Sequence, residues 1–265
     1  MSIAAKINAV LLLMIVLLSG VIWVSQQPER MHPLLPTLSI ENIEHITVTP
    51  FGQPEMRLHK QAGRWLLATL EDFPANADVL KHLMALTQAE ILSDYALPEL
   101  RSEFGLARGV VITFNAQSVT LGKLDPVRKQ RYVQANERLY LIFDRYSHHL
   151  QTSLVSPKLL PEEGQLEQVE LPHRVLKRDP NGWQSSPELA AKTLQNSVNL
   201  WTHAEAQKVV LLSQAPSDSN VVLQLEHQRI RYWFDAQEKT LTRLKPAIRY
   251  YLSDTLIAQL MPHKD

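Results

Sequence analysis

The feature that most constrains the fold is a pattern of residues that occurs twice along the chain. Its first copy reads LHKQAGRW at residues 58–65, and its second reads LKRDPNGW at residues 176–183. Each copy has a leucine, two basic or imidazole side chains, a turn that contains glycine, and a tryptophan. A turn of this kind between apolar flanks is typical of a β-hairpin, so we expect a hairpin at both places.

A helix is predicted after each hairpin, because apolar residues recur there at the spacing of one helix face. The positions are Val79, Leu83 and Leu86 in the first half, and Leu194, Val198 and Trp201 in the second. Both helices end in Thr-x-Ala-Glu, at residues 87–90 and 202–205. Pro74 and Pro187 lie near the two helix starts, where proline suits a first turn.

The remaining elements of the two halves also correspond. Residues 111–121 and 222–232 alternate apolar and polar side chains around a short turn, which predicts a strand pair in each half. Residues 138–150 and 247–260 each predict a strand, then an aspartate that caps a short helix, Asp144 or Asp254.

We therefore predict an α+β fold with two tandem similar units, each made mostly of antiparallel strands packed with one main helix. The first unit covers residues 39–150, a linker covers residues 151–164, and the second unit covers residues 165–261. The alternative is chance similarity among amphipathic elements.

An apolar run at residues 7–24, INAVLLLMIVLLSGVIWV, contains no charge. As a helix it is roughly 27 Å long, close to the hydrocarbon thickness of a bilayer. It predicts a single transmembrane signal anchor, and Lys6 before it places residues 1–6 in the cytoplasm. Residues 25–38 contain Pro28, Pro33 and Pro36 and are predicted to be a tether. The alternatives are a cleaved signal peptide, which lacks suitable small residues here, and a buried core helix.

This topology predicts a bacterial inner-membrane protein with one span, a cytoplasmic N-terminus and a periplasmic C-terminal domain. Lysine plus arginine equals aspartate plus glutamate, 27 against 27, so nucleic acid is not an expected partner. The chain has no cysteine, which excludes disulfides and thiolate chemistry. We expect no cofactor and no metal, because the sequence contains no phosphate-binding glycine loop, nucleophile elbow or zinc-binding helix motif.

Two clusters are candidate interaction surfaces. One is basic and stands beside Pro126, and it suits an anionic lipid headgroup or an acidic partner. The other is a run of three aromatic residues, of which a strand exposes alternate members. Their members are Arg128, Lys129 and Arg131, and Tyr232, Trp233 and Phe234. For the basic cluster the simpler interpretation is a solvated loop between strands, and an exposed member of the aromatic run can instead lie against the other unit.

Five other residues are candidates for chemistry or ligand binding. Asp144, His148 and His149 have the spacing of a partial metal site, although a solvated helix end is the simpler interpretation. Trp65 and Trp183 suit either a ligand groove or the core.

The order of several motifs resembles the bacterial domain-of-unknown-function 4340 family. The residues that carry the resemblance are Gly63-Arg64-Trp65, Pro74-Ala75-Asn76-Ala77, Glu103-Phe104-Gly105-Leu106, Leu121-Gly122-Lys123-Leu124-Asp125, Arg131-Tyr132-Val133 and Leu139-Tyr140-Leu141-Ile142. It covers residues 40–150 well and the second half loosely, because Tyr232-Trp233-Phe234 stands where Leu-Gly is expected. The resemblance implies a membrane-anchored envelope protein, in some members associated with ABC transporters, and it implies no catalytic residue.

Three functions follow from these expectations. The first is a non-enzymatic accessory subunit that binds another membrane or envelope protein, in a transport or envelope-assembly complex. The alternative is a periplasmic module that binds a glycan, peptide or lipid in a groove between the two units. The third is a hydrolase that uses Asp144, His148 or an acidic pair, and it needs convergent polar groups in a pocket.

Overall fold

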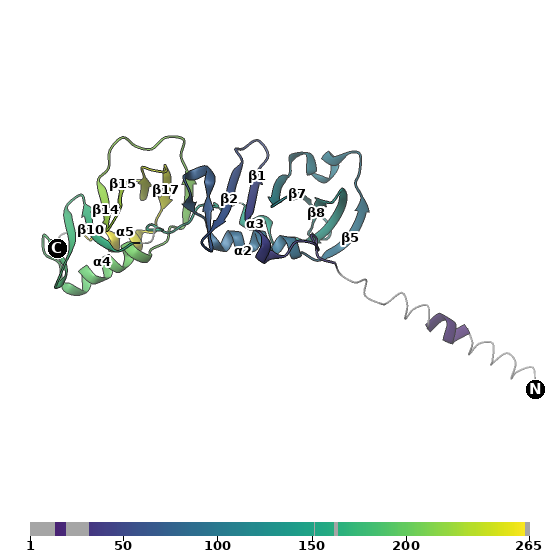
Figure 1. Cartoon of the computed structure of the whole chain (residues 1–265), viewed down its shortest axis with the longest axis horizontal. Coiled ribbons are helices and arrows are strands. Elements are labelled where there is room, and N and C mark those ends of the chain that lie inside the picture. Colours follow the sequence, from purple (N-terminus) through teal and green to yellow (C-terminus); the bar gives the residue numbers. More distant parts are fainter. Residues whose placement is uncertain (1–13, 20–31, 151, 162–163, 263–265) are drawn as a thin grey trace, which may run out of the picture.

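The computed structural model describes residues 14–19, 32–150, 152–161 and 164–262. The chain is α+β, with two antiparallel sheets and few helices (Figure 1). Each sheet belongs to one half of the chain, so the two halves form two units that lie side by side along the long axis of the molecule.

Unit 1 contains a nine-stranded sheet in the order β4-β3-β2-β1-β6-β7-β8-β9-β5. Its strands are β1 (His45–Thr49), β2 (Met56–Gln61), β3 (Arg64–Leu67), β4 (Phe73–Pro74), β5 (Ile91–Ala96), β6 (Val110–Phe114), β7 (Gln117–Leu124), β8 (Gln130–Ala135) and β9 (Arg138–Phe143). Its helices are η1 (Ile40–Asn42), η2 (Ala68–Leu70), α2 (Ala77–Ala85), η3 (Leu86–Gln88), η4 (Arg101–Phe104), η5 (Leu106–Arg108) and α3 (Ser147–Leu150).

Unit 2 contains an eight-stranded sheet in the order β12-β11-β10-β14-β15-β16-β17-β13. Its strands are β10 (Leu166–Leu171), β11 (Arg174–Asp179), β12 (Gly182–Ser186), β13 (Lys208–Leu211), β14 (Val221–Leu225), β15 (Arg229–Asp235), β16 (Thr240–Arg243) and β17 (Ile248–Tyr251). Its helices are α4 (Ala191–His203) and α5 (Asp254–Leu260).

The two sheets have the same strand order once the two-residue β4 is set aside. In each unit the third strand along the chain, β3 or β12, then lies at one edge of the sheet. The strand that follows the main helix, β5 or β13, lies at the other edge. The predicted hairpins are β2–β3 and β11–β12, with Gln61 opposite Arg64 and Asp179 opposite Gly182. The predicted main helices are α2 and α4, so the sequence pattern identified matching elements of one repeated topology.

The helix ends differ in detail from the expectations. Pro74 lies in β4 rather than in a first helical turn, and the side chain of Asn76 caps α2 by accepting hydrogen bonds from two backbone N–H groups. The predicted cap of α5, Asp254, is wrong, whereas Asp144 accepts a hydrogen bond from the N–H of Tyr146 at 3.4 Å, directly before α3. Ser253 caps α5 through the N–H of Leu256, and Asp144 takes part in an ion pair described below.

A short segment before each sheet belongs to the unit that follows it, which corrects the predicted tether and linker. The N–H of Leu34 donates to the carbonyl of Ala89 at 3.0 Å, and the N–H of Leu159 donates to the carbonyl of Ala204 at the same distance. Leu34 is 1% exposed and Leu159 is fully buried. The predicted tether at 25–38 and linker at 151–164 are therefore too long, because each includes residues that pair with the end of a unit's main helix.

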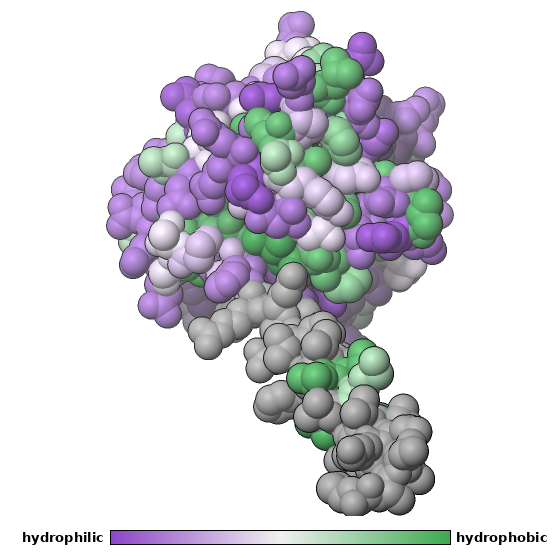
Figure 2. Space-filling model, turned by 90° about the vertical axis from the view of Figure 1, so that its right-hand side faces the viewer, coloured by the Kyte–Doolittle hydropathy of each residue, from purple (hydrophilic) through white to green (hydrophobic). Residues whose placement is uncertain are grey.

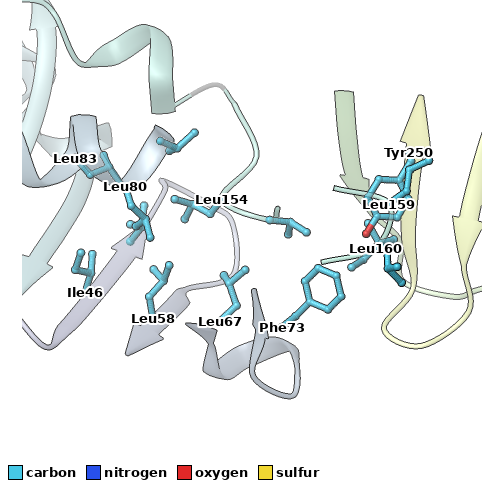
Figure 3. Close-up of a cluster of buried hydrophobic side chains, with 14 of the residues drawn as sticks. Ile46, Leu58, Leu67, Phe73, Leu80, Leu83, Leu154, Leu159, Leu160 and Tyr250 are labelled. Atoms are coloured by element: carbon cyan, nitrogen blue, oxygen red, sulfur yellow. The ribbon is translucent and has the colours of Figure 1, made fainter. Parts of the chain in front are cut away.

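The segment between the units joins them into one body. The N–H of Asn76 donates to the carbonyl of Leu154, and the N–H of Ser156 donates to the carbonyl of Pro74. Leu159, three residues after Ser156, donates its N–H to the carbonyl of Ala204 in unit 2. The buried apolar side chains of both units form one continuous cluster, in which Phe73 of unit 1 lies close to Leu160 (Figure 3).

The predicted cytoplasmic N-terminus at 1–6 lies outside the described residues. So does the predicted membrane span at 7–24, apart from residues 14–19, which are helical and exposed. Among the residues that the structure describes, no helix has the length and apolarity needed to cross a membrane.

Candidate interaction surfaces

Arg131 does not belong to an exposed basic cluster. Its guanidinium Nη2 lies 2.9 Å from Oδ2 of Asp144, and the side chains are 14% and 8% exposed. A second nitrogen of the guanidinium donates to the carbonyl of Gly122. Arg131 therefore braces three segments of unit 1, and this part of the predicted surface is wrong.

The other two basic residues, Arg128 and Lys129, are exposed on the loop that joins β7 and β8. Asp125 holds this loop, because its Oδ1 accepts hydrogen bonds from the N–H groups of Val127 and Arg128 at 2.8 and 3.1 Å. These backbone hydrogen bonds lower the pKa of Asp125 below its usual value, so the carboxylate stays ionised at neutral pH. The loop presents two cations in a fixed backbone conformation.

The aromatic run of β15 divides between the core and the surface. Tyr232 is fully buried, and its hydroxyl donates to the carbonyl of Leu159. Trp233 is 36% exposed and Phe234 is half-buried against the core. Only Trp233 is a surface aromatic, so the predicted patch reduces to one side chain.

A covering segment in unit 1 explains why Trp233 has no aromatic counterpart there. Val110 of β6 lies opposite Leu121 of β7, and the equivalent Val221 of β14 lies opposite Tyr232 of β15. Gly122, the residue after Leu121, is therefore the counterpart of Trp233. A Cβ at Gly122 would collide with the carbonyl oxygen of Phe104 in η4. Unit 1 therefore covers this position with η4 and η5, and unit 2 leaves a tryptophan there.

A hollow of about 550 Å³ lies between the two units. It is lined by β3 and β4 from unit 1, by Pro161, and by β15 and the β16–β17 connection from unit 2. Its exposed cations are Arg64, Arg229, Arg231 and Lys245, and its acidic groups are Glu71 and Asp72. A hollow with a mostly basic charged lining is therefore present between the two units.

A second hollow of about 600 Å³ lies against the same seam and includes Trp65. Trp65 is half-buried and packs against the core, as does its counterpart Trp183 in unit 2. Trp65 lines a hollow and also packs against the core, and its role in a ligand groove stays a prediction.

The proposed partial metal site does not assemble. Asp144 is held by Arg131, and His149 stacks on His82 of α2 with ring centroids 3.5 Å apart. Burial and the neighbouring His82 and His148 imidazoles lower the pKa of His149 below its usual value. In the described part of the chain, no group of three or more His, Cys, Asp or Glu side chains is placed to hold a metal ion.

Comparison with known proteins adds no relative. No protein-family model matches the chain, no curated protein matches it, and no solved structure matches it. The resemblance to the domain-of-unknown-function 4340 family stays a prediction, and any function has to be argued from the residues and the geometry.

Proposed function

We propose that the chain is a single-pass protein of the bacterial inner membrane whose two periplasmic units act together as a non-enzymatic accessory subunit. Its partner in this proposal is another membrane or envelope protein of a transport or envelope-assembly complex. The observation that carries the proposal is the uncharged apolar run at residues 7–24, followed within a few residues by one continuous two-unit body. A folded two-unit body held beside a membrane suits a binding surface for a neighbouring membrane protein.

Trp233 gives the partner proposal a specific site. Exposed tryptophan is enriched in the centres of protein interfaces, and the equivalent place in unit 1 is covered by the chain itself. A photo-crosslinking residue at position 233 of the full-length protein, activated in native membranes, is expected to capture a membrane protein. The matched control is Lys192, which is exposed at the start of α4. Equal capture at both positions, or none at either, would refute the proposed site.

The basic hollow favours a second candidate, a module that binds an anionic ligand between the units. Four exposed cations line the hollow together with two acidic side chains, so an extended anion such as an acidic peptide is the matching ligand class. Poly-glutamate titrated into the full-length protein is expected to bind at low salt and to bind weakly after R231A and K245A together. K192A is the control, and unchanged binding by the double variant would exclude this hollow.

A further inference from the structure

The two units contain the same loop at the same place in their sheets. Asp125–Lys129 joins β7 to β8, and Asp235–Lys239 joins β15 to β16. In unit 2, Oδ1 of Asp235 accepts hydrogen bonds from the N–H groups of Gln237 and Glu238, at 2.9 and 3.0 Å. Asp125 accepts the corresponding two hydrogen bonds in unit 1. The closing lysines have φ angles of 54° and 55°. The two loops therefore share the same side-chain-to-backbone hydrogen bonds and the same left-handed conformation at their last residue.

The tips of the two loops carry opposite chemistry. Unit 1 has Val127 and Arg128 where unit 2 has Gln237 and Glu238. Val127 is 86% exposed, the highest value among the large hydrophobic side chains described. Because unit 2 makes the same loop from polar and acidic residues, the loop conformation does not require a valine or an arginine at its tip. The exposure of Val127, beside the cations Arg128 and Lys129, therefore needs an explanation other than the loop conformation.

The loop of unit 1 lies at the end of the sheet where the chain enters the unit. Gln130, directly after the loop, pairs with Phe143, and the neighbouring strand β5 begins at Ile91, opposite Ile142. The entering chain forms a bridge between Pro33 and Glu90, just before β5. Two strand spacings separate β8 from β5, so the loop and the entry point are on the order of 10 Å apart across the sheet.

This end of unit 1 is also within reach of the predicted membrane span. Eight residues separate Val24 from Pro33, and eight extended residues cover at most about 29 Å. Two other large hydrophobic side chains are exposed at this end, namely Leu124, which lies opposite Arg131, and Phe143, which lies opposite Gln130. Figure 2 views the outer end of unit 1 and shows hydrophobic residues near its centre and at parts of its rim, while strand β15, which leads into the loop of unit 2, lies in the other half of the molecule (Figure 1).

We propose that the Asp125–Lys129 loop is a membrane-contact loop that docks on a bilayer containing anionic phospholipid. Val127 enters the boundary between headgroups and acyl chains, and Arg128 and Lys129 bind lipid phosphates. The loop thereby holds unit 1 against the membrane and fixes how the two-unit body stands on it. This inference rests on the proposed membrane anchor and adds the lipid surface as a partner of a named loop.

The absence of cysteine makes the test direct, because one introduced cysteine is the only site of labelling. Full-length V127C and Q237C are labelled with an environment-sensitive fluorophore and placed in vesicles of phosphatidylcholine with or without phosphatidylglycerol. We expect a blue shift and quenching by brominated lipid for the label at 127, stronger with phosphatidylglycerol, and no change for the label at 237. A label at 127 that stays in water in both vesicle types would overturn the proposal.

The sequence of unit 2 supplies a variant that keeps the fold. V127Q and R128E together give unit 1 the tip that unit 2 already carries on the same backbone. With the label moved to L124C, the exchange is expected to abolish the phosphatidylglycerol-dependent shift without changing the melting temperature. An unchanged shift would contradict the assigned roles of the two tip residues.

Two further outcomes separate this inference from the function on which it rests. Protein that alkaline carbonate releases from native membranes has no membrane span, and both proposals then fail. In the other outcome, the protein resists extraction but the label at 127 is protected from water only when other membrane proteins are present. This result overturns the lipid proposal alone and assigns the loop to a protein partner.

Discussion

Substitution of Leu34 by alanine tests whether the segment before the first sheet is part of the folded body. Leu34 is 1% exposed, and its N–H pairs with the end of the main helix of unit 1. Leu→Ala at a buried site costs about 3–5 kcal/mol of unfolding free energy, from lost burial and the cavity that remains. For a chain of this size we expect the midpoint of thermal unfolding to fall by roughly 6–12 °C for a loss of about 3 kcal/mol.

The assay is thermal unfolding of the full-length protein in detergent, followed by circular dichroism. Leu159 is the matched position of unit 2, and L159A is expected to shift the same transition by a similar amount, because the buried cluster is continuous across the units. Ser39 is exposed and its side chain caps nothing, so S39A is expected to change the free energy by less than about 0.5 kcal/mol. If L34A were as mild as S39A, residue 34 would behave as tether and our boundary would be wrong.

Three further perturbations follow from single contacts. R131A leaves the carboxylate of Asp144 in a nearly buried site, so we expect a loss of about 3 kcal/mol in urea unfolding, and R131K is expected to recover only part of it. Because the pKa of His149 is lowered in the folded protein, the unfolded chain binds more protons, and the free energy of unfolding is expected to fall as the pH drops below about 6.5. H149F is expected to flatten this pH dependence. An H149F variant with the same pH dependence as the wild type would contradict the assignment. S253A removes the cap of α5 and is expected to cost about 1 kcal/mol, measured by the same urea titration.

Much of the repeated topology was predictable because hairpins and amphipathic helices leave local signals. The pattern at 58–65 and 176–183 located both hairpins, and the apolar spacing located α2 and α4. The edge strands β5 and β13 were missed. Each follows the main helix but pairs with the last strand of its unit, and a pairing between distant segments leaves no local pattern.

The unit boundaries were missed for a different reason. Leu34-Leu35-Pro36 and Leu159-Leu160-Pro161 are themselves a repeated motif, with the leucines of each copy buried. Nearby prolines indicate an extended chain, and an extended chain is compatible both with a tether and with a segment that pairs with a helix end. Only the partner carbonyls of Ala89 and Ala204 decide between them.

The candidate sites were predictable only as residue types. Exposure separates Arg128 and Lys129 from Arg131, and Trp233 from Tyr232, although each set is contiguous or nearly so in sequence. The sequence does contain one local signal of a repeated loop. Asp125 and Asp235 begin equivalent five-residue loops that end in lysine, and aligning these loops shows the exchange of Val-Arg for Gln-Glu at their tips.

Where the C-terminus lies relative to the membrane tests the central claim most directly, that an N-terminal apolar helix places both units outside the cytoplasm. A reporter enzyme that is active only outside the cytoplasm, fused after Asp265 of the full-length chain, is expected to be active. A reporter that works only in the cytoplasm is expected to be silent at the same position. Activity of the cytoplasmic reporter would contradict the topology, and the proposed lipid and protein partners of the two units would lose their setting.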